Sequence, residues 1–465
     1  MKSLLTKLNW KQSFSLIIIC LFSITVCSNI FAFDYSVTKS SASFETGTFS
    51  FAVSELNTKG GGTISFSISG QVTTSVSSVT LTVPTIVDGG SDVILINDLD
   101  ANNTLTLKNI TISSGSDIRA FSGGEMEYTT IHGSVDFRGD GASNTIKTCD
   151  FIGGYGTFGS NYTLNTFCSY SNAVIILKES CKMNCFSTSC YGNNTLSLYD
   201  YNAVDGLGNF DVNIQGELNS VFNSELRRFN VNGDYNDFSG NTIVCDGYAN
   251  KFVGNNNTIQ SNNVSSITSS YQYIKIEGNA NFVKHNNSTI AFFVKGDTNE
   301  FHYNTVLDTV DNSLIEKFEG DHNEVHYNTF ASAMDKSVTI LGTSNEFYYN
   351  NSFSNNIGLL INGDYNEVYG NIIGVSNVNF DVGNNQGIKI ESGWFNKIGS
   401  DDDPSYQNFI AGNDGNGIEI EYGGNNEIVN NNIGLDVDDN NYGNSAHGIY
   451  LNNTVSNIIK GGNYI

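Results

Sequence analysis

The sequence predicts an all-β protein, a single-stranded right-handed parallel β-helix with a short N-terminal capping helix. A short phrase, Asn-x-Φ-x-x-Asn with Φ apolar, occurs eight times in full and twice with another last residue, and it returns every 18 to 31 residues. A period of this length that carries a strand-like core indicates a solenoid in which each repeat adds one layer. No helical pattern separates the repeats, so stacking is the remaining way to connect parallel strands. The phrase begins at Asn236, Asn257, Asn281, Asn299, Asn323, Asn345, Asn366, Asn396, Asn426 and Asn457.

Residues 1–32 have the pattern of a secretory signal peptide. Lys2, Lys7 and Lys11 precede an apolar run at residues 14–26, and Ala32 ends the predicted segment. The run is short for a membrane-spanning helix, which needs roughly 20 apolar residues. We therefore expect residues 33–465 to form one exported β-helix domain, secreted or at the cell surface, without a transmembrane segment.

The charge of the chain excludes several partners. Loss of residues 1–32 removes three lysines and no acids, which changes the formal net charge from −25 to −28. Such a surface repels the phosphates of nucleic acids. It also repels polyuronates unless divalent cations bridge the two surfaces.

The N-terminal elements follow from hydrophobic periodicity. Residues 44–56 place Phe49, Ala52, Val53 and Leu56 on one side of a helix of about three turns, which we expect to cap the stack. Alternating residues at 63–70, 81–89 and 105–112 predict the first strands.

Each clear repeat predicts three short strands. Residues 359–361 form an apolar segment before the phrase at Asn366, and residues 371–373 form another after it. Three strands per coil give a triangular cross-section, and the crossover preference makes the coil right-handed.

The segments that carry a family resemblance are residues 47–53, 84–89, 432–434, 442–444 and 447–451. The chain resembles the secreted right-handed β-helix repeat proteins of the pectate-lyase-like superfamily over nearly all of residues 33–465. That superfamily contains polysaccharide lyases, hydrolases, epimerases and surface proteins, so the resemblance implies the fold without deciding the function.

The active-site motifs of that superfamily are not matched. Pectate lyases have Arg-x-Pro-x-x-Arg, but neither Pro84 nor Pro404 lies in such a pattern. Residues 446–448, Ala-His-Gly, match the Gly-His-Gly element of polygalacturonases only in part. The Asp-Pro-His element of alginate epimerases is absent because Ser405 follows Pro404. Whether the protein is an enzyme stays open at this point.

Two outward columns are the candidate site. Strand alternation directs the second and fourth positions of the phrase outward. Carboxylates beside imidazoles and phenols are the groups that sugar chemistry uses, although repeat duplication alone also copies surface residues. If the protein is an enzyme, Glu324 is the candidate acid or base and His326 its partner. The ligand-binding candidates are Glu300, His302, Glu346, Tyr348, Glu367 and Tyr369.

Turn residues have structural explanations. The two Asn residues of each phrase are expected to form side-chain ladders that satisfy turn amides between coils. Each Asp in the Gly-Asp-x-Asn turns is expected to close an Asx-type turn. These acids are Asp234, Asp297, Asp321 and Asp364.

Two further candidate sites each have two interpretations. Asp436, Asp438 and Asp439 offer oxygen ligands for calcium, and a solvated acidic loop is the other interpretation. Cys149 and Cys168 occupy similar places in successive coils, within disulfide reach, and buried thiols are the alternative.

The chain ends inside a coil, from which we expect a C-terminal truncation.

These features favour a secreted or cell-surface scaffold that binds or adheres to glycans, with no catalytic motif. The alternative is a polysaccharide-active enzyme, a lyase, hydrolase or epimerase. A polysaccharide or cell-surface glycan is the expected partner, and calcium the one cofactor to consider.

Overall fold

The computed structural model describes residues 33–465 except 42, 73–77, 97, 139–144, 148, 153, 160–161, 167–169, 172, 180, 186–189, 192–193, 209, 246–249, 267–272, 309–315, 333–336 and 376–382. The predicted signal peptide lies outside the described residues. Among the helices of the described part, none is both long and apolar enough to cross a bilayer. The chain forms two compact units, residues 1–162 and 163–465.

The first unit is a stack of parallel strands. One sheet contains β1 (Phe33–Val37), β2 (Gly62–Phe66), β5 (Thr85–Leu95), β7 (Leu105–Ile112) and β9 (Gly124–Glu127). A second contains β4 (Ser78–Leu81), β6 (Asp98–Ala101), β8 (Asp117–Ala120), β11 (Ser134–Phe137) and β14 (Tyr155–Phe158). The strand predicted at 81–89 is interrupted near Pro84, which has no N–H to donate to a neighbouring strand.

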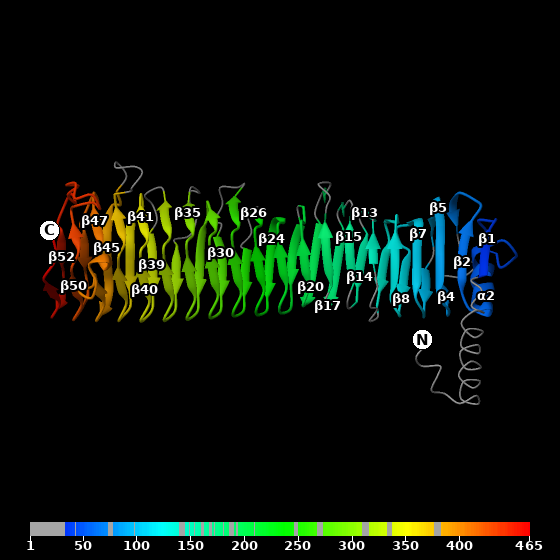
Figure 1. Ribbon diagram of the computed structural model, residues 1–465, viewed down its shortest axis with the longest axis horizontal. Coiled ribbons are helices and arrows are strands. Elements are labelled where there is room, and N and C mark those ends of the chain that lie inside the picture. Colours follow the sequence, from blue (N-terminus) through cyan, green and yellow to red (C-terminus); the bar gives the residue numbers. More distant parts are fainter. Residues whose placement is uncertain are drawn as a thin grey trace, which may run out of the picture. The chain divides into compact units, whose positions relative to one another are not determined.

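One helix covers the N-terminal end of this stack. Helix α2 (Phe49–Lys59) packs against β1, β2 and β4 (Figure 1). The four residues predicted to face the strands are all buried. The helix begins later than predicted because Gly47 has a φ of 97° and Thr48 caps the first turn, accepting a hydrogen bond from the Phe51 N–H at 3.4 Å.

The second unit repeats a coil of three short strands. In one coil these are β42 (Ile357–Asn362), β43 (Glu367–Tyr369) and β44 (Ile372–Gly374), as predicted. Every strand pairs in parallel with its counterpart in the next coil, so successive coils lie side by side (Figure 1). The predicted parallel β-helix is thereby confirmed.

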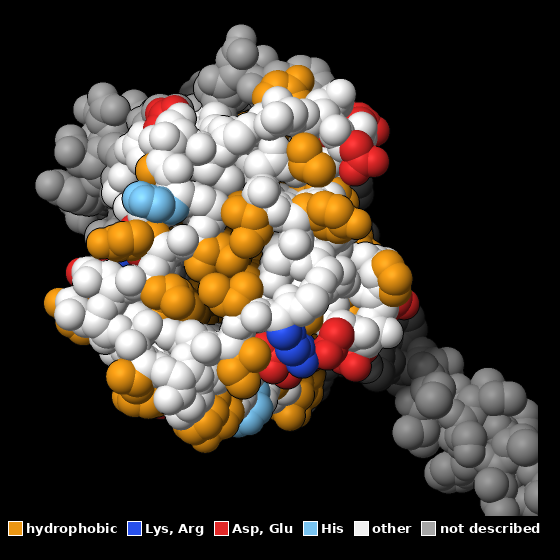
Figure 2. Space-filling view, turned by 90° about the vertical axis from the view of Figure 1, so that its left-hand side faces the viewer, with side chains coloured by type: hydrophobic (Ala, Val, Ile, Leu, Met, Phe, Trp, Pro, Cys, Tyr) orange, Lys and Arg blue, Asp and Glu red, His pale blue; other side chains and the backbone are white. Residues whose placement is uncertain are grey.

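The third residue of each phrase, the apolar Φ, packs into the core. Val325, Phe347 and Val368 stack in register and are fully buried. The final coil in this sequence, residues 449–465, exposes several apolar side chains, among them Ile459 and Ile465. Figure 2 shows hydrophobic side chains gathered at the centre of this end.

Two asparagine ladders hold the coils in register. In the first, the backbone N–H of each Asn donates to the side-chain Oδ1 of the Asn one coil later, as from Asn299 to Asn323 at 2.9 Å. In the second, the Asn304 N–H donates to Asn328 Oδ1 at 2.8 Å. Nearly all members are buried, so each side chain satisfies backbone groups that water does not reach. The predicted ladders are confirmed.

The aspartates beside these ladders act differently from the prediction. Asp321 Oδ1 accepts the backbone N–H of Thr343 in the next coil at 2.7 Å, and Asp364 Oδ1 accepts that of Trp394 at 2.8 Å. The Asx-turn interpretation was wrong for these residues because stacking brings the N–H of the following coil within reach of the carboxylate.

We expect Asn328→Ala to lower the free energy of unfolding. The side chain of Asn328 also donates to the Phe301 carbonyl at 2.8 Å, so its loss leaves buried backbone groups unpaired at a cost of about 1–3 kcal/mol each. Denaturant unfolding measures the change. Asn356→Ala is the control, since the Asn356 side chain has an exposed hydrogen bond with Asn385, and an equal loss in both variants would contradict the ladder's role.

We also expect Gly320→Ala to destabilise the fold. Gly320 has a φ of 138°, and an added Cβ would lie 2.1 Å from the carbonyl oxygen of Gly296 in the preceding coil. Backbone strain of this kind costs about 1–3 kcal/mol, which thermal unfolding would register as a lower Tm. Gly461→Ala, where a Cβ meets nothing within 4 Å, should leave the Tm unchanged.

Candidate functional site

The two predicted columns lie on one outward sheet face of the second unit. The strands are β34 (Glu300–His302), β37 (Glu324–His326), β40 (Glu346–Tyr348) and β43 (Glu367–Tyr369). Their register places the four glutamates in one row. The same pairings place His302, His326, Tyr348 and Tyr369 in a second row two residues further along. The fold thus brings together all of the catalytic and ligand-binding candidates.

The rings pair with glutamates of the preceding coil. The Tyr348 hydroxyl donates to Glu324 Oε2 at 3.1 Å, and the Tyr369 hydroxyl donates to Glu346 Oε2 at 2.7 Å. His326 follows the same rule, because its Nε2 lies 3.3 Å from Glu300 Oε1.

The rings thus pair diagonally, each with the glutamate of the preceding coil. This pattern determines which contacts the predicted acid–base pair, Glu324 and His326, can make. His326 pairs with Glu300 and Glu324 pairs with Tyr348, so the hydrogen bonds among the described residues do not join Glu324 to His326. Catalysis by these two residues stays a prediction without a supporting contact. Glu367 is exposed and lies opposite Lys397 in the next coil.

The rings of the second row form a stack, which we call the inner ring row. Ring centroids are 4.9 Å apart for His302 and His326, 4.5 Å for His326 and Tyr348, and 5.0 Å for Tyr348 and Tyr369. The last two pairs are nearly parallel, at 2° and 10°. Strand spacing sets this distance, since neighbouring strands lie about 4.8 Å apart.

A second stack, the outer ring row, was missed from the sequence. It consists of His285, Tyr303, Tyr327 and Tyr349, with centroids 5.1, 4.9 and 5.0 Å apart along the row. Each occupies the position before the second Asn of its phrase, with φ between 52° and 55°. The left-handed backbone turns these side chains outward beside the sheet. The recurring Tyr at that position was the signal that could have found the row.

Stacking decides how these rings meet a ligand. Tyr348 is covered on both faces, by His326 and by Tyr369, and Tyr327 lies between Tyr303 and Tyr349. These interior rings therefore have no free face on which a sugar ring could stack. The outer row presents ring edges and phenol hydroxyls, and Tyr303 and Tyr327 are nearly half exposed.

Burial favours the uncharged form of three side chains of the inner ring row. It is the main cause that raises the pKa of Tyr348 well above its ordinary value, with the Glu324 carboxylate adding to the effect. Burial and then the hydrogen bond to Glu346 raise the pKa of Tyr369 likewise. Burial lowers the pKa of His302, which the carboxylate of Glu300 opposes. At neutral pH these three side chains are therefore uncharged hydrogen-bonding groups.

The acidic loop near the C-terminus uses its oxygens internally. Asp436 accepts the backbone N–H groups of Asp438 at 2.9 Å and Asn440 at 2.8 Å. Burial acts against its charge, but the hydrogen bond from the Asn440 side chain at 2.9 Å, together with these backbone bonds, holds the pKa of Asp436 below its ordinary value. Asp438 and Asp439 lie in the same turn, and within the described residues the ligand atoms of no three His, Cys, Asp or Glu side chains of this loop lie within 4.8 Å of one another. Calcium binding there stays a prediction.

The predicted disulfide stays a prediction too. Cys149 is buried, and Cys168 lies outside the described residues.

Comparison with known proteins finds only distant similarity to solved structures. No protein-family model matches it, and no curated protein does. It is similar to the tailspike protein of E. coli bacteriophage HK620 in complex with a hexasaccharide, at 12% identity and a TM-score of 0.29, covering 88% of this chain and 75% of the other. It is also similar to a periplasmic alginate epimerase, at 13% identity and a TM-score of 0.22, covering 83% and 78%. At these values no site or activity transfers to this chain.

We predict a loss of stability in alkali that depends on Tyr348 and Tyr369. Because the folded state raises the pKa of both phenols, the stability they contribute is present below about pH 10 and declines as the pH rises beyond it. The denaturant midpoint of the wild type should fall between about pH 9 and about pH 11. The fall should be smaller in the Tyr348→Phe/Tyr369→Phe double variant, and an unchanged fall would contradict the prediction.

Proposed function

We propose that this protein is an extracellular β-helix scaffold whose Glu, His and Tyr face binds a neutral polysaccharide without cleaving it. The observation that carries the proposal is the outer ring row. It presents phenol hydroxyls one coil apart, next to the inner ring row, which in turn forms hydrogen bonds with the row of carboxylates. A linear polymer of hydroxylated units offers a repeating set of donors and acceptors to such a surface.

The polarity of the face supports a hydroxyl-rich ligand. Glu324 and Glu367 are exposed acceptors, and the exposed phenols of Tyr303 and Tyr327 both donate and accept. Hydrogen bonds to charged groups contribute more than neutral ones. Because the ring faces are covered, recognition depends on these polar atoms and on ring edges.

The charge of the chain supports a neutral ligand. A formal net charge of −25 makes an acidic polysaccharide unfavourable at low salt unless divalent cations lie between the surfaces. The predicted signal segment and this surface polarity both favour an extracellular location. A surface of repeated hydrogen-bonding groups also suits adhesion to a cell-surface glycan.

Binding to a panel of neutral and acidic polysaccharides, with and without calcium, tests the proposal. The triple variant Tyr303→Phe/Tyr327→Phe/Tyr349→Phe keeps the rings stacked and removes only the hydroxyls. We expect its affinity to fall about tenfold or more, since each neutral hydrogen bond is worth about 0.5–1.5 kcal/mol.

The matched control is Tyr235→Phe/Tyr365→Phe. Both residues are exposed tyrosines with positive φ in other turns of the second unit, so their loss should leave affinity unchanged. Absence of binding to every polysaccharide, or equal loss in both variants, would refute the proposal. New reducing ends or unsaturated products, abolished by Glu324→Gln, would establish the alternative, a polysaccharide-active enzyme.

A further inference from the structure

We infer that Glu300, His302 and His326 form a binding site for one divalent transition-metal ion of the zinc class. One ligand atom from each residue lies within 4.8 Å of the other two. In the described part of the chain this is the one group of three such side chains at that spacing. The inference does not require glycan binding, which the proposal above assigns chiefly to the phenols of the outer ring row and to the exposed Glu324 and Glu367 of the same face.

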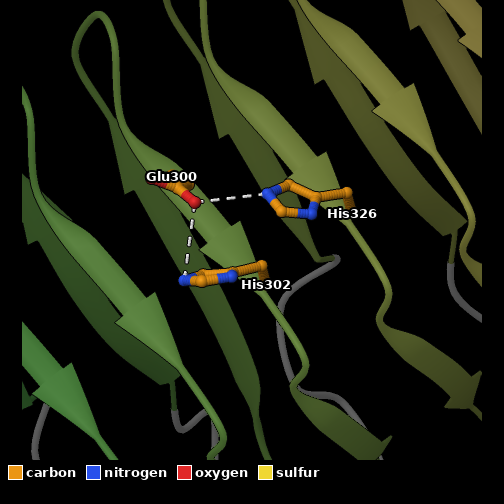
Figure 3. Close-up of side chains that lie close together, drawn as sticks. All are labelled: Glu300, His302 and His326. Atoms are coloured by element: carbon orange, nitrogen blue, oxygen red, sulfur yellow. Dashed lines mark hydrogen bonds and ion pairs between the residues drawn. The ribbon is translucent and has the colours of Figure 1, made fainter.

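The fold fixes the three side chains on two paired strands. Glu300 and His302 lie two residues apart on β34, so both point to the same side of the sheet. His326 lies directly opposite His302 on β37. Figure 3 shows the two imidazoles directed toward the same carboxylate oxygen of Glu300. Parallel pairing on a stacked sheet holds this arrangement without any loop.

The distances suit a small ion. Glu300 Oε1 lies 3.3 Å from His326 Nε2 and 3.6 Å from His302 Nε2. Tetrahedral zinc has ligands at about 2.0–2.1 Å, which places ligand atoms about 3.3–3.5 Å apart. The two imidazole rings are tilted by 33°, whereas His326 and Tyr348 are parallel within 2°. The pair beside Glu300 thus departs from the stacking that the rest of the row follows.

The hydrogen bonding of the histidines also points to a ligand. His302 Nε2 is buried and has no hydrogen-bond partner, although it faces a carboxylate. A buried nitrogen without a partner is unfavourable, and a coordinated ion would satisfy it. Two imidazole nitrogens with one carboxylate oxygen suit zinc and similar ions, while calcium and magnesium prefer oxygen ligands alone.

The groups around the three ligand residues indicate how tightly they would bind a metal ion. Imidazoles that bind metals almost always donate their other N–H to an acceptor, but His326 Nδ1 is buried without a partner. We therefore expect micromolar binding, weaker than that of closed structural zinc sites. Glu300 is about one-third exposed, which leaves the fourth coordination position open to water or to a small ligand.

Isothermal titration of the untagged, chelator-treated chain with zinc chloride tests the site. We expect one ion per chain with micromolar Kd, and a large excess of calcium should not compete. Glu300→Gln and His302→Gln should each weaken binding at least about tenfold, given that even outer-shell changes cost 10–100-fold. Cobalt(II) should give the visible absorption of a tetrahedral complex with the wild type and lose it in both variants.

The control is His322→Asn. His322 is an exposed histidine at positive φ in the same coil as His326, and Asn tolerates that backbone, so this variant should bind zinc as the wild type does. Circular dichroism establishes that each variant folds. No stoichiometric binding by the wild type, or binding that survives both ligand substitutions, would overturn the inference. Loss of zinc binding with polysaccharide binding intact, or the reverse, separates this site from the proposed function.

Discussion

The hydrogen bond from one asparagine backbone to the side chain of the next asparagine underlies the second unit. Each such bond joins equivalent positions of neighbouring coils, as in Asn323 to Asn345 at 2.8 Å. Turns at the corners of a β-helix leave backbone groups that no strand can satisfy, and burial makes those groups costly. An amide side chain can accept from one coil and donate to another, so a column of asparagines solves this problem at every layer.

Register then determines the surface. Once the ladders align the coils, residues at the same phrase position lie about one strand spacing apart. Rings in such a column must stack, and like charges must lie side by side. Glu324 and Glu346 are adjacent in register, and the hydroxyls of Tyr348 and Tyr369 each donate to one of these carboxylates. The diagonal pairing is how the sheet accommodates a row of acids.

The same stacking presents different chemical groups where the column contains tyrosine and where it contains histidine. Covered ring faces remove the usual platform for a sugar ring and leave hydroxyls and edges. Where the column changes from tyrosine to histidine, the rings carry nitrogen lone pairs in place of hydroxyls, and two of them face Glu300 (Figure 3). A row of hydroxyl-bearing rings and a compact nitrogen–oxygen cluster thus follow from one repeat with different residues at its fourth position.

The sequence alone determined the repeat, its strands, the inward Phe or Val of each phrase, the asparagine ladders and the two outward columns. These depend on periodicity, which is local and reads directly from residue spacing. Tertiary structure decided what depends on the offset between coils. It placed His326 with Glu300 and Glu324 with Tyr348, directed Asp321 to the next coil, and revealed the outer row through Tyr327 at a φ of 54°. No spacing within one coil encodes that offset, because it arises only when two coils stack.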